Sequence, residues 1–155
     1  KWREFKNMKE QFVNVVKGEV KDIAACSDEI FAQKALGDGV LIVPQDNIIV
    51  SPCDGEIVSV FPTKHAISML SETGVEILIH IGIDTVELEG QGFEQLVENN
   101  TKVSKSEPIM KVDFDLVREK GYDPATMMIF TSNPEIQKSN LNQIANKYIT
   151  VVETI

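Results

Sequence analysis

The sequence predicts an all-β fold, a sandwich or barrel of antiparallel strands with a few short helices. Short apolar or alternating segments are separated by turns rich in glycine, proline and asparagine, a pattern typical of such folds. Helical patterns are few and short, so the strands do not alternate with long helices as they do around a parallel sheet. The length of 155 residues suits a single domain.

The predicted strands are alternating segments or apolar runs that end at turn residues. An alternating segment begins at Gly18, and an apolar run ends at Pro44. The strongest strand covers residues 75–83, where every second residue is aliphatic. In chain order, the predicted strands are 18–23, 40–43, 48–50, 57–60, 75–83, 109–112, 127–130 and 148–152.

Three short helices are predicted in the second half of the chain. One covers residues 93–98. Another covers residues 113–120, with Asp113 as its N-cap and Gly121 closing it. A third begins at residues 133–135, because a proline suits the first helical position.

Apolar residues at helical spacing predict an amphipathic arm, or the remnant of a linker, ahead of the core. The spacing covers residues 1–12. We therefore divide a single domain into an N-terminal arm of residues 1–13 and a β-sandwich core of residues 14–155.

The chain carries 15 basic and 24 acidic residues, which give it a net charge of −9. Such a chain lacks the basic face that nucleic acids and anionic lipids require, so we expect it to bind neither. Its charge instead suits a partner with a positive surface. No apolar run approaches the length of a membrane span, so we expect no direct insertion into a membrane.

The sequence shows no secretion signal, and we therefore expect a cytoplasmic protein. In a reducing compartment, Cys26 and Cys53 are expected to be buried free thiols. A single disulfide between them is the alternative.

The predicted strand 75–83 places His80 on the face opposite its aliphatic residues, because side chains alternate along a strand. Gly82 lies beside His80 on that face and would allow a partner's surface to approach closely. Asp84 follows on the same face, ~13 Å away in an extended strand. An ordinary surface histidine is the alternative interpretation of His80.

His65 lies fifteen residues before His80, a separation that fits two adjacent strands with a connection between them. The two imidazoles can then meet across the strand pair, one as a nucleophile and the other as a donor to negative charge. The hydroxyl of Thr63, on the same side as His65 in an extended segment, can decide which ring nitrogen carries the proton. A turn histidine bonded to the local backbone is the alternative for His65.

The residues around these histidines closely resemble a known family. The segment Gly74-Val-Glu-Ile-Leu-Ile-His80-Ile-Gly-Ile-Asp84-Thr, with His65-Ala66 before it and Gly90-x-Gly92-Phe93 after it, resembles the glucose-type EIIA domain. This domain is the IIA component of the bacterial phosphoenolpyruvate:sugar phosphotransferase system, or PTS. The resemblance extends over about residues 18–153 and also includes Pro52-x-Asp54-Gly55-x-Ile57.

The resemblance implies a β-sandwich with Greek-key connections and a phosphocarrier function in sugar uptake. It implies that His80 accepts a phosphoryl group from the phosphocarrier HPr and passes it to the cysteine of an EIIB domain. His65 would stabilise the phosphate, and Thr63 would orient His65. No cofactor and no metal are implied, and any membrane association would come through a permease.

The resemblance also implies a docking face around His80. Its apolar ring would consist of Ile30, Phe31, Leu36, Phe61, Ser68 and Leu78. Its acidic rim would consist of Asp28, Asp84 and Glu87.

The chain departs from the family pattern in a few places. Asn100 and Ser106 stand where the family has glycines, and serine accepts a left-handed backbone less readily than asparagine. Leu70 stands where the family has an acidic residue, a change that bears on the choice of partner.

Two other functions stay open. One is a regulatory binding module whose phosphorylation state controls partner proteins, because a phosphate adds about −1.5 to −2 charges to the docking face. The other is a zinc site. A catalytic zinc needs three protein ligands, and the chain has only two histidines, so His65 and His80 would need a carboxylate from a partner.

Overall fold

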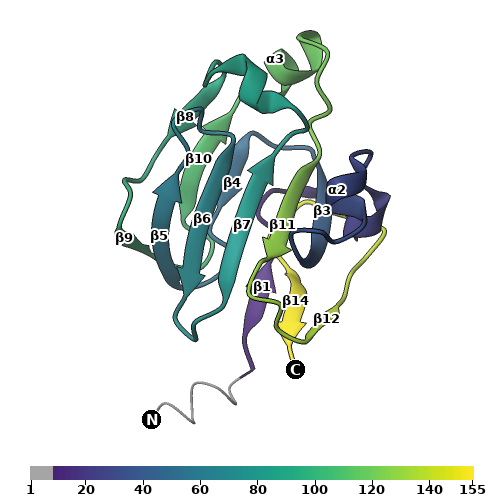
Figure 1. Cartoon of the computed structure of the whole chain (residues 1–155), viewed down its shortest axis with the longest axis vertical. Coiled ribbons are helices and arrows are strands. Elements are labelled where there is room, and N and C mark those ends of the chain that lie inside the picture. Colours follow the sequence, from purple (N-terminus) through teal and green to yellow (C-terminus); the bar gives the residue numbers. More distant parts are fainter. Residues whose placement is uncertain (1–8) are drawn as a thin grey trace.

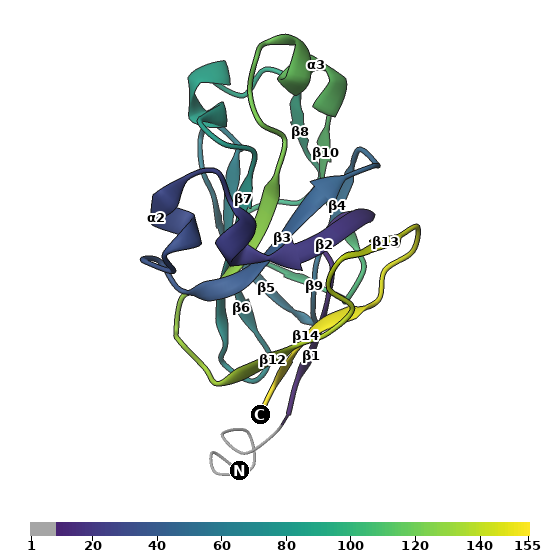
Figure 2. The same cartoon turned by 90° about the vertical axis from the view of Figure 1, so that its right-hand side faces the viewer.

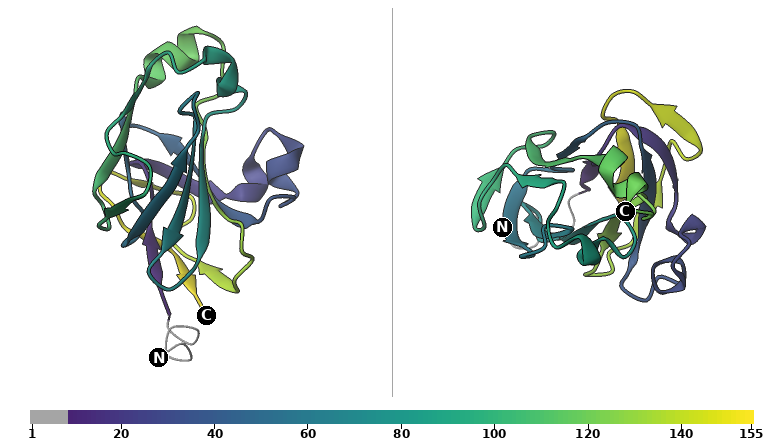
Figure 3. Two further views of the ribbon diagram at one scale, coloured as in Figure 1. Left: turned by 60° about the vertical axis from the view of Figure 1, so that its left-hand side comes forward. Right: turned by 90° about the horizontal axis from the view of Figure 1, so that it is seen from above.

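The computed structural model describes residues 9–155, which form a β-sandwich with two short α-helices (Figure 1). Every strand pairing in this part of the chain is antiparallel, as predicted. Seen from above, the strands surround the interior (Figure 3). Strand β11 lies between β3 and β7, so the long connections cross between the two halves of the main sheet, as the predicted Greek-key topology requires.

The main sheet has eight strands in the order β13-β2-β3-β11-β7-β6-β5-β9. Figure 1 shows β7 between β6 and β11, near the middle of this sheet. Its strands are β13 (Gln143–Ala145), β2 (Gly18–Asp22), β3 (Asp38–Pro44), β11 (Thr126–Phe130), β7 (Glu76–Ile81), β6 (Ala66–Ser71), β5 (Gly55–Val60) and β9 (Thr101–Val103).

Two three-stranded sheets complete the sandwich, in the orders β4-β10-β8 and β1-β14-β12. Their strands are β4 (Ile48–Val50), β10 (Pro108–Val112), β8 (Phe93–Gln95), β1 (Gln11–Val13), β14 (Thr150–Thr154) and β12 (Ile136–Lys138). All eight segments predicted as strands overlap strands of the structure.

The predicted helix at 113–120 is confirmed as α3 (Phe114–Glu119). The carboxylate of Asp113 accepts a hydrogen bond from the N–H of Leu116, and Gly121 ends the helix with a φ of +88°. The other helices are α2 (Glu29–Ala32) and the 3₁₀ helices η1 (Ile23–Ala25) and η2 (Thr85–Leu88). None of the helices in residues 9–155 is long and apolar enough to cross a bilayer.

The other two helix predictions are wrong, because strand pairing overrides the local pattern. Phe93–Gln95 forms β8, in which Phe93 is buried and Glu94 is exposed, and it pairs with β10. The segment after Asn133 leads into β12, which pairs with β14. Both segments are short enough that tertiary partners decide their conformation.

The expected helical arm is also wrong where the structure describes it. Gln11–Val13 is strand β1, paired with β14 near both ends of the described chain (Figures 1 and 2). Phe12 is fully buried, and its ring packs edge-on against Phe130 with the centroids 5.0 Å apart. Residues 1–8 of the predicted arm lie outside the described residues.

Apolar side chains gather on both faces of the main sheet. The larger cluster fills the sandwich and takes Ile77, Ile79 and Ile81 from β7, as their alternation predicts. The smaller cluster lies on the outer face, between η1 and α2 on one side and β3 and β11 on the other. Its buried members are Ile23, Cys26, Phe31, Leu41, Ile83, Ala125, Met127 and Ile129.

Both cysteines are buried free thiols, as predicted.

Asn100 and Ser106 both adopt positive φ values, +63° and +70°. The two residues therefore take the left-handed backbone for which the family pattern uses glycine.

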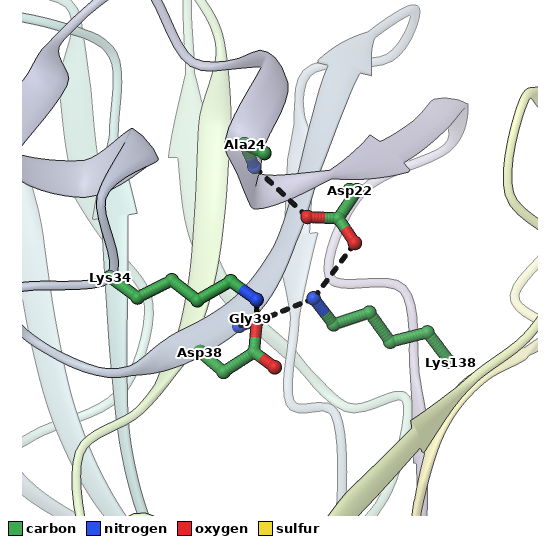
Figure 4. A network of polar contacts seen from close by, with 6 residues as sticks. All are labelled: Asp22, Ala24, Lys34, Asp38, Gly39 and Lys138. Atoms are coloured by element: carbon green, nitrogen blue, oxygen red, sulfur yellow. Dashed lines mark hydrogen bonds and ion pairs between the residues drawn. The ribbon is translucent and has the colours of Figure 1, made fainter.

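A half-buried lysine ties the sheet β1-β14-β12 to the main sheet (Figure 4). The Nζ of Lys138, at the end of β12, lies 3.0 Å from a carboxylate oxygen of Asp22 and also pairs with Asp38. The Lys138 side chain is only 10% exposed. Burial alone would raise the pKa of each carboxyl, but backbone N–H groups and the Lys138 ammonium outweigh it and lower both pKa values.

We predict that Lys138→Met lowers the free energy of unfolding by about 1–3 kcal/mol at pH 7, because two paired carboxylates lose their common partner. Both carboxyls have pKa values below the ordinary 3.8, so this stabilisation is complete above about pH 4 and is lost as the pH falls through the folded-state values. Urea unfolding at pH 7 and pH 3 measures the difference.

The matched control is Lys111→Met, at an exposed lysine of β10, and we expect it to change stability by less than about 0.5 kcal/mol. Equal losses for the two variants would show that Lys138 contributes no more than a surface lysine.

Candidate active site

His80 lies in β7, which is paired on both sides and is therefore firmly held. It pairs with Ala66 of β6 on one side and with Met127 of β11 on the other. His65 directly precedes β6, and its carbonyl oxygen accepts a hydrogen bond of 2.7 Å from the N–H of Ile81. The ladder thereby brings the two imidazoles together, with ring centroids 5.1 Å apart and planes at 84°. Their predicted meeting across two adjacent strands is confirmed.

A hydrogen bond of 2.7 Å joins the hydroxyl of Thr63 to Nδ1 of His65, the contact that the sequence predicted. A turn produces it rather than the extended segment we expected, because Lys64 between them adopts a left-handed backbone with φ +62°. When the hydroxyl donates to Nδ1, the proton of the neutral ring must lie on Nε2. The contact can therefore make His65 a hydrogen-bond donor through Nε2.

The proton of His80 has a defined place. Its Nδ1 lies 2.9 Å from the carbonyl oxygen of Gly82. A carbonyl oxygen only accepts hydrogen bonds, so Nδ1 carries the proton in the neutral ring. The lone pair then lies on Nε2, which is the form of imidazole that can attack an electrophile. A main-chain carbonyl has no signature in the sequence, and the sequence analysis missed it.

Two phenylalanines extend the histidine pair into a row of four rings. Phe61 packs edge-on against His65 at 5.7 Å, and Phe31 of α2 packs against His80 at 4.8 Å. Phe31 is 8% exposed and Phe61 is 41% exposed. The row covers the two imidazoles with apolar surface and removes water from them.

This burial makes both histidines hard to protonate. Burial lowers the pKa of His65. Burial, followed by the nearby His65, lowers the pKa of His80 to about 4, although the Gly82 carbonyl and the charges of Asp28 and Asp84 act in the opposite direction. His80 is therefore a neutral imidazole at pH 7.

The structure corrects the expected roles of Gly82 and Asp84. Gly82 is buried and does not open the face to a partner; a Cβ atom there would lie 2.3 Å from Cγ2 of Thr85. The chain turns at Gly82, whose φ is +79°, so Asp84 does not continue the strand face. Asp84 itself has a left-handed φ of +61° and an exposed side chain.

The residues expected to form the docking ring divide by exposure. Ile30, Leu36 and Phe61 are exposed, at 59%, 43% and 41%. Ser68 and Leu78 are half-buried beside each other, paired between β6 and β7. Phe31 is the exception, because it belongs to the smaller apolar cluster and its ring supports His80 from within.

The three residues expected to form the acidic rim are not equivalent. Asp28 is half-buried, and its carboxylate caps α2 by accepting from the N–H of Ile30 at 2.9 Å. Asp84 and Glu87 are exposed at the start and within the first turn of η2. Asp28 therefore has a structural role besides its charge, whereas the other two are free to meet a partner.

Within residues 9–155, no group of three or more histidine, cysteine or carboxylate side chains is arranged to hold a metal ion. The two imidazole rings lie edge to face, with their centroids 5.1 Å apart.

Residues 10–136 match the family model for the phosphoenolpyruvate-dependent sugar phosphotransferase system, EIIA 1. The chain is 44% identical over 117 residues to the PTS system glucose-specific EIICBA component of Staphylococcus carnosus, a match that covers 76% of this chain. It is 42% identical over 126 residues to the glucosamine-specific EIICBA component of Bacillus subtilis, which covers 81% of this chain. These matches span 17% and 20% of the two relatives.

A solved structure supports the same assignment. The glucose permease IIA from Mycoplasma capricolum superposes with a TM-score of 0.86 and is 32% identical, and the match covers 96% of this chain and 97% of that one. The shared fold extends over nearly the whole of both proteins. Because the family model covers most of the chain, this protein belongs to the EIIA 1 family of the phosphoenolpyruvate-dependent sugar phosphotransferase system.

Proposed function

We propose that this domain is a phosphocarrier in which His80 accepts a phosphoryl group from HPr and passes it to the cysteine of an EIIB domain during sugar uptake. The observation that carries the proposal is the state of His80: a neutral ring with its proton held on Nδ1 by the Gly82 carbonyl, which leaves the Nε2 lone pair free. The names of the EIICBA relatives, which combine C, B and A parts, support an EIIB acceptor.

In the first step, the Nε2 lone pair of His80 attacks the phosphorus of the phosphorylated donor. A P–N bond forms, and the bond between phosphorus and the donor breaks, its electron pair returning to the donor. The Nδ1 proton stays on His80, hydrogen-bonded to Gly82, and shares the positive charge that develops on the ring. Such a loose transition state needs alignment and charge stabilisation more than covalent chemistry.

In the second step, the phosphoryl group leaves for the cysteine thiolate of EIIB. The S–P bond forms, the N–P bond breaks, and its electron pair restores the Nε2 lone pair. An Nε2–H of His65, 5.1 Å away between ring centroids, is near enough to donate to a phosphoryl oxygen in both steps. The Thr63 hydroxyl keeps His65 in that tautomer when it donates to Nδ1.

The surface charge suits a basic donor protein. The chain carries a net charge of −9, and Asp84 and Glu87 are exposed just beyond His80 in the sequence. Opposite charge speeds the encounter of two proteins more than it tightens the complex, which suits a carrier that must bind and release quickly.

The first prediction concerns the acceptor atom. His80→Gln should fold and take no label from enzyme I, HPr and radiolabelled phosphoenolpyruvate, because the amide has no nucleophilic lone pair. Intact mass and peptide mapping measure the label, and the wild-type protein is the positive control. Label that persists in His80→Gln, or that maps to His65, would contradict the assignment.

The second prediction concerns the pKa of His80. NMR titration of the ring should show an inflection near pH 4, well below the ordinary 6.5, because partial burial and the nearby His65 both disfavour the charged ring. In His65→Gln the inflection should move upward, since one of the two causes is removed. A wild-type inflection at pH 6 or above would show that His80 is more hydrated than its packing implies.

The same shift predicts how stability depends on pH. The unfolded chain binds a proton at His80 below about pH 6.5 and the folded chain only near pH 4, so stability is complete above 6.5 and falls between the two values. The wild-type protein should lose up to roughly 3 kcal/mol more than His80→Gln over this window. Parallel curves for the two proteins in urea unfolding would contradict the prediction.

The third prediction separates the two histidines. His65→Gln should still accept phosphate from phosphorylated HPr, because an amide can also donate a hydrogen bond. Transfer onward to EIIB should slow by ~10²–10³-fold, the scale of losing one well-placed donor. The amide is not held by Thr63 as the ring is, so we expect its weaker donation to suffice for acceptance but not for the second step. Rapid-quench measurement of each half-reaction decides it, and unchanged rates in both would remove His65 from the mechanism.

A further inference from the structure

We propose that Thr85 is a positioning residue for His80: its buried side chain holds the peptide group before Gly82, so that the Gly82 carbonyl oxygen stays on the Nδ1 proton of His80. The inference rests on the proposed function, in which Nε2 of His80 is the nucleophile. It assigns to Thr85 control over which nitrogen of His80 carries the lone pair.

Thr85 closes the turn that follows β7. It is fully buried at the start of η2, and its hydroxyl donates a hydrogen bond to the carbonyl oxygen of Ile81, four residues earlier. The turn between them contains Gly82 and Asp84, which both have positive φ values. A turn with two left-handed residues gains little from local backbone preference, so its shape depends on such contacts.

The methyl group of Thr85 makes a second contact with the turn. Its Cγ2 occupies the space beside Gly82, where a Cβ atom would lie only 2.3 Å away. The absence of a side chain at position 82 therefore makes room for Thr85. Gly82 also supplies the φ of +79° that other residues rarely adopt.

Four hydrogen bonds hold the two peptide groups on either side of Gly82. In the first group, the Ile81 carbonyl accepts from Thr85, and the Gly82 N–H donates to the carbonyl of Ala125 at 2.9 Å. In the second group, the Ile83 N–H donates to the carbonyl of Asp123 at 2.9 Å. The N–H and C=O of a trans peptide point in opposite directions, so this bond turns the Gly82 carbonyl away from Asp123. The fourth bond joins that carbonyl to Nδ1 of His80.

The hydroxyl of Thr85 is the only side-chain donor among these four bonds besides His80 itself. Without it, the peptide before Gly82 keeps a single bond, and only the Ile83 N–H still orients the Gly82 carbonyl. The flexible glycine then lets that carbonyl turn away in part of the molecules. Nδ1 of His80 then loses its acceptor, and the proton of the neutral ring can move to Nε2. Each molecule in that tautomer lacks the lone pair for attack.

The test compares Thr85→Val, which removes the hydroxyl but keeps the shape, with Thr85→Ser, which keeps the hydroxyl and removes the methyl. ¹⁵N NMR of the unphosphorylated protein at pH 8 reports the tautomer of the neutral His80 ring. We expect the Nδ1–H form in the wild type and in Thr85→Ser, and a mixture with the Nε2–H form in Thr85→Val. If about a tenth of the molecules keep the Nδ1–H form, phosphoryl acceptance should fall by about tenfold.

Thr154→Val is the matched control for the loss of a buried hydroxyl. Thr154 is 8% exposed, and its hydroxyl is bonded to the backbone of Glu10, near the chain ends. This variant should lose stability, yet keep the wild-type tautomer and the wild-type rate of phosphoryl acceptance.

The proposal fails if folded Thr85→Val keeps the wild-type tautomer of His80. It also fails if Thr85→Val and Thr85→Ala both fail to fold, because Thr85 would then serve the fold rather than the site. A wild-type protein that shows the Nδ1–H form but takes no label on His80 would overturn the proposed function instead, since the tautomer is measured without phosphate.

Discussion

The hydrogen bond from Nδ1 of His80 to the carbonyl oxygen of Gly82 is the contact on which the candidate site depends. A carbonyl cannot donate, so one contact sets both the orientation of the ring and the nitrogen that carries the lone pair. The contact can be precise because both ends are held: β7 is paired on two sides, and the Gly82 turn is bonded to the loop at residues 123–125. The chemistry of one side chain thereby rests on the backbone of the main sheet.

The apolar surroundings of this contact decide the charge of the ring. Phe31 and His65 pack against His80 and remove water from it, which disfavours the imidazolium. Asp28 and Asp84 favour the imidazolium, but burial outweighs them, and the pKa falls to about 4. The domain can therefore carry a net charge of −9 while the His80 ring itself stays neutral.

Particular elements show how much of the fold was predictable from the sequence. The alternation of Ile77, Ile79 and Ile81 identified the core face of β7 correctly, because a strand buried on one face imposes that pattern on its residues. Phe93 and Phe12 were assigned to helical segments and lie in short strands instead. A three-residue strand has too few positions to show a period, and its conformation comes from the strand it pairs with.

The sequence by itself determined that the chain is all-β, that His80 lies opposite the core face of its strand, and that His65 and Thr63 are within reach of one another. These features follow from side-chain alternation and from short separations along the chain, which are local properties. Only the tertiary structure decided that the chain bends at Gly82 and that Phe31 packs against His80. The bend depends on hydrogen bonds to residues about forty positions later in the chain. The packing of Phe31 depends on helix α2, which lies far ahead of His80 in the sequence. Contacts between such distant segments leave no periodic pattern in the sequence, so the hydrogen-bond partner of the His80 Nδ1 appears only once the sheet is assembled.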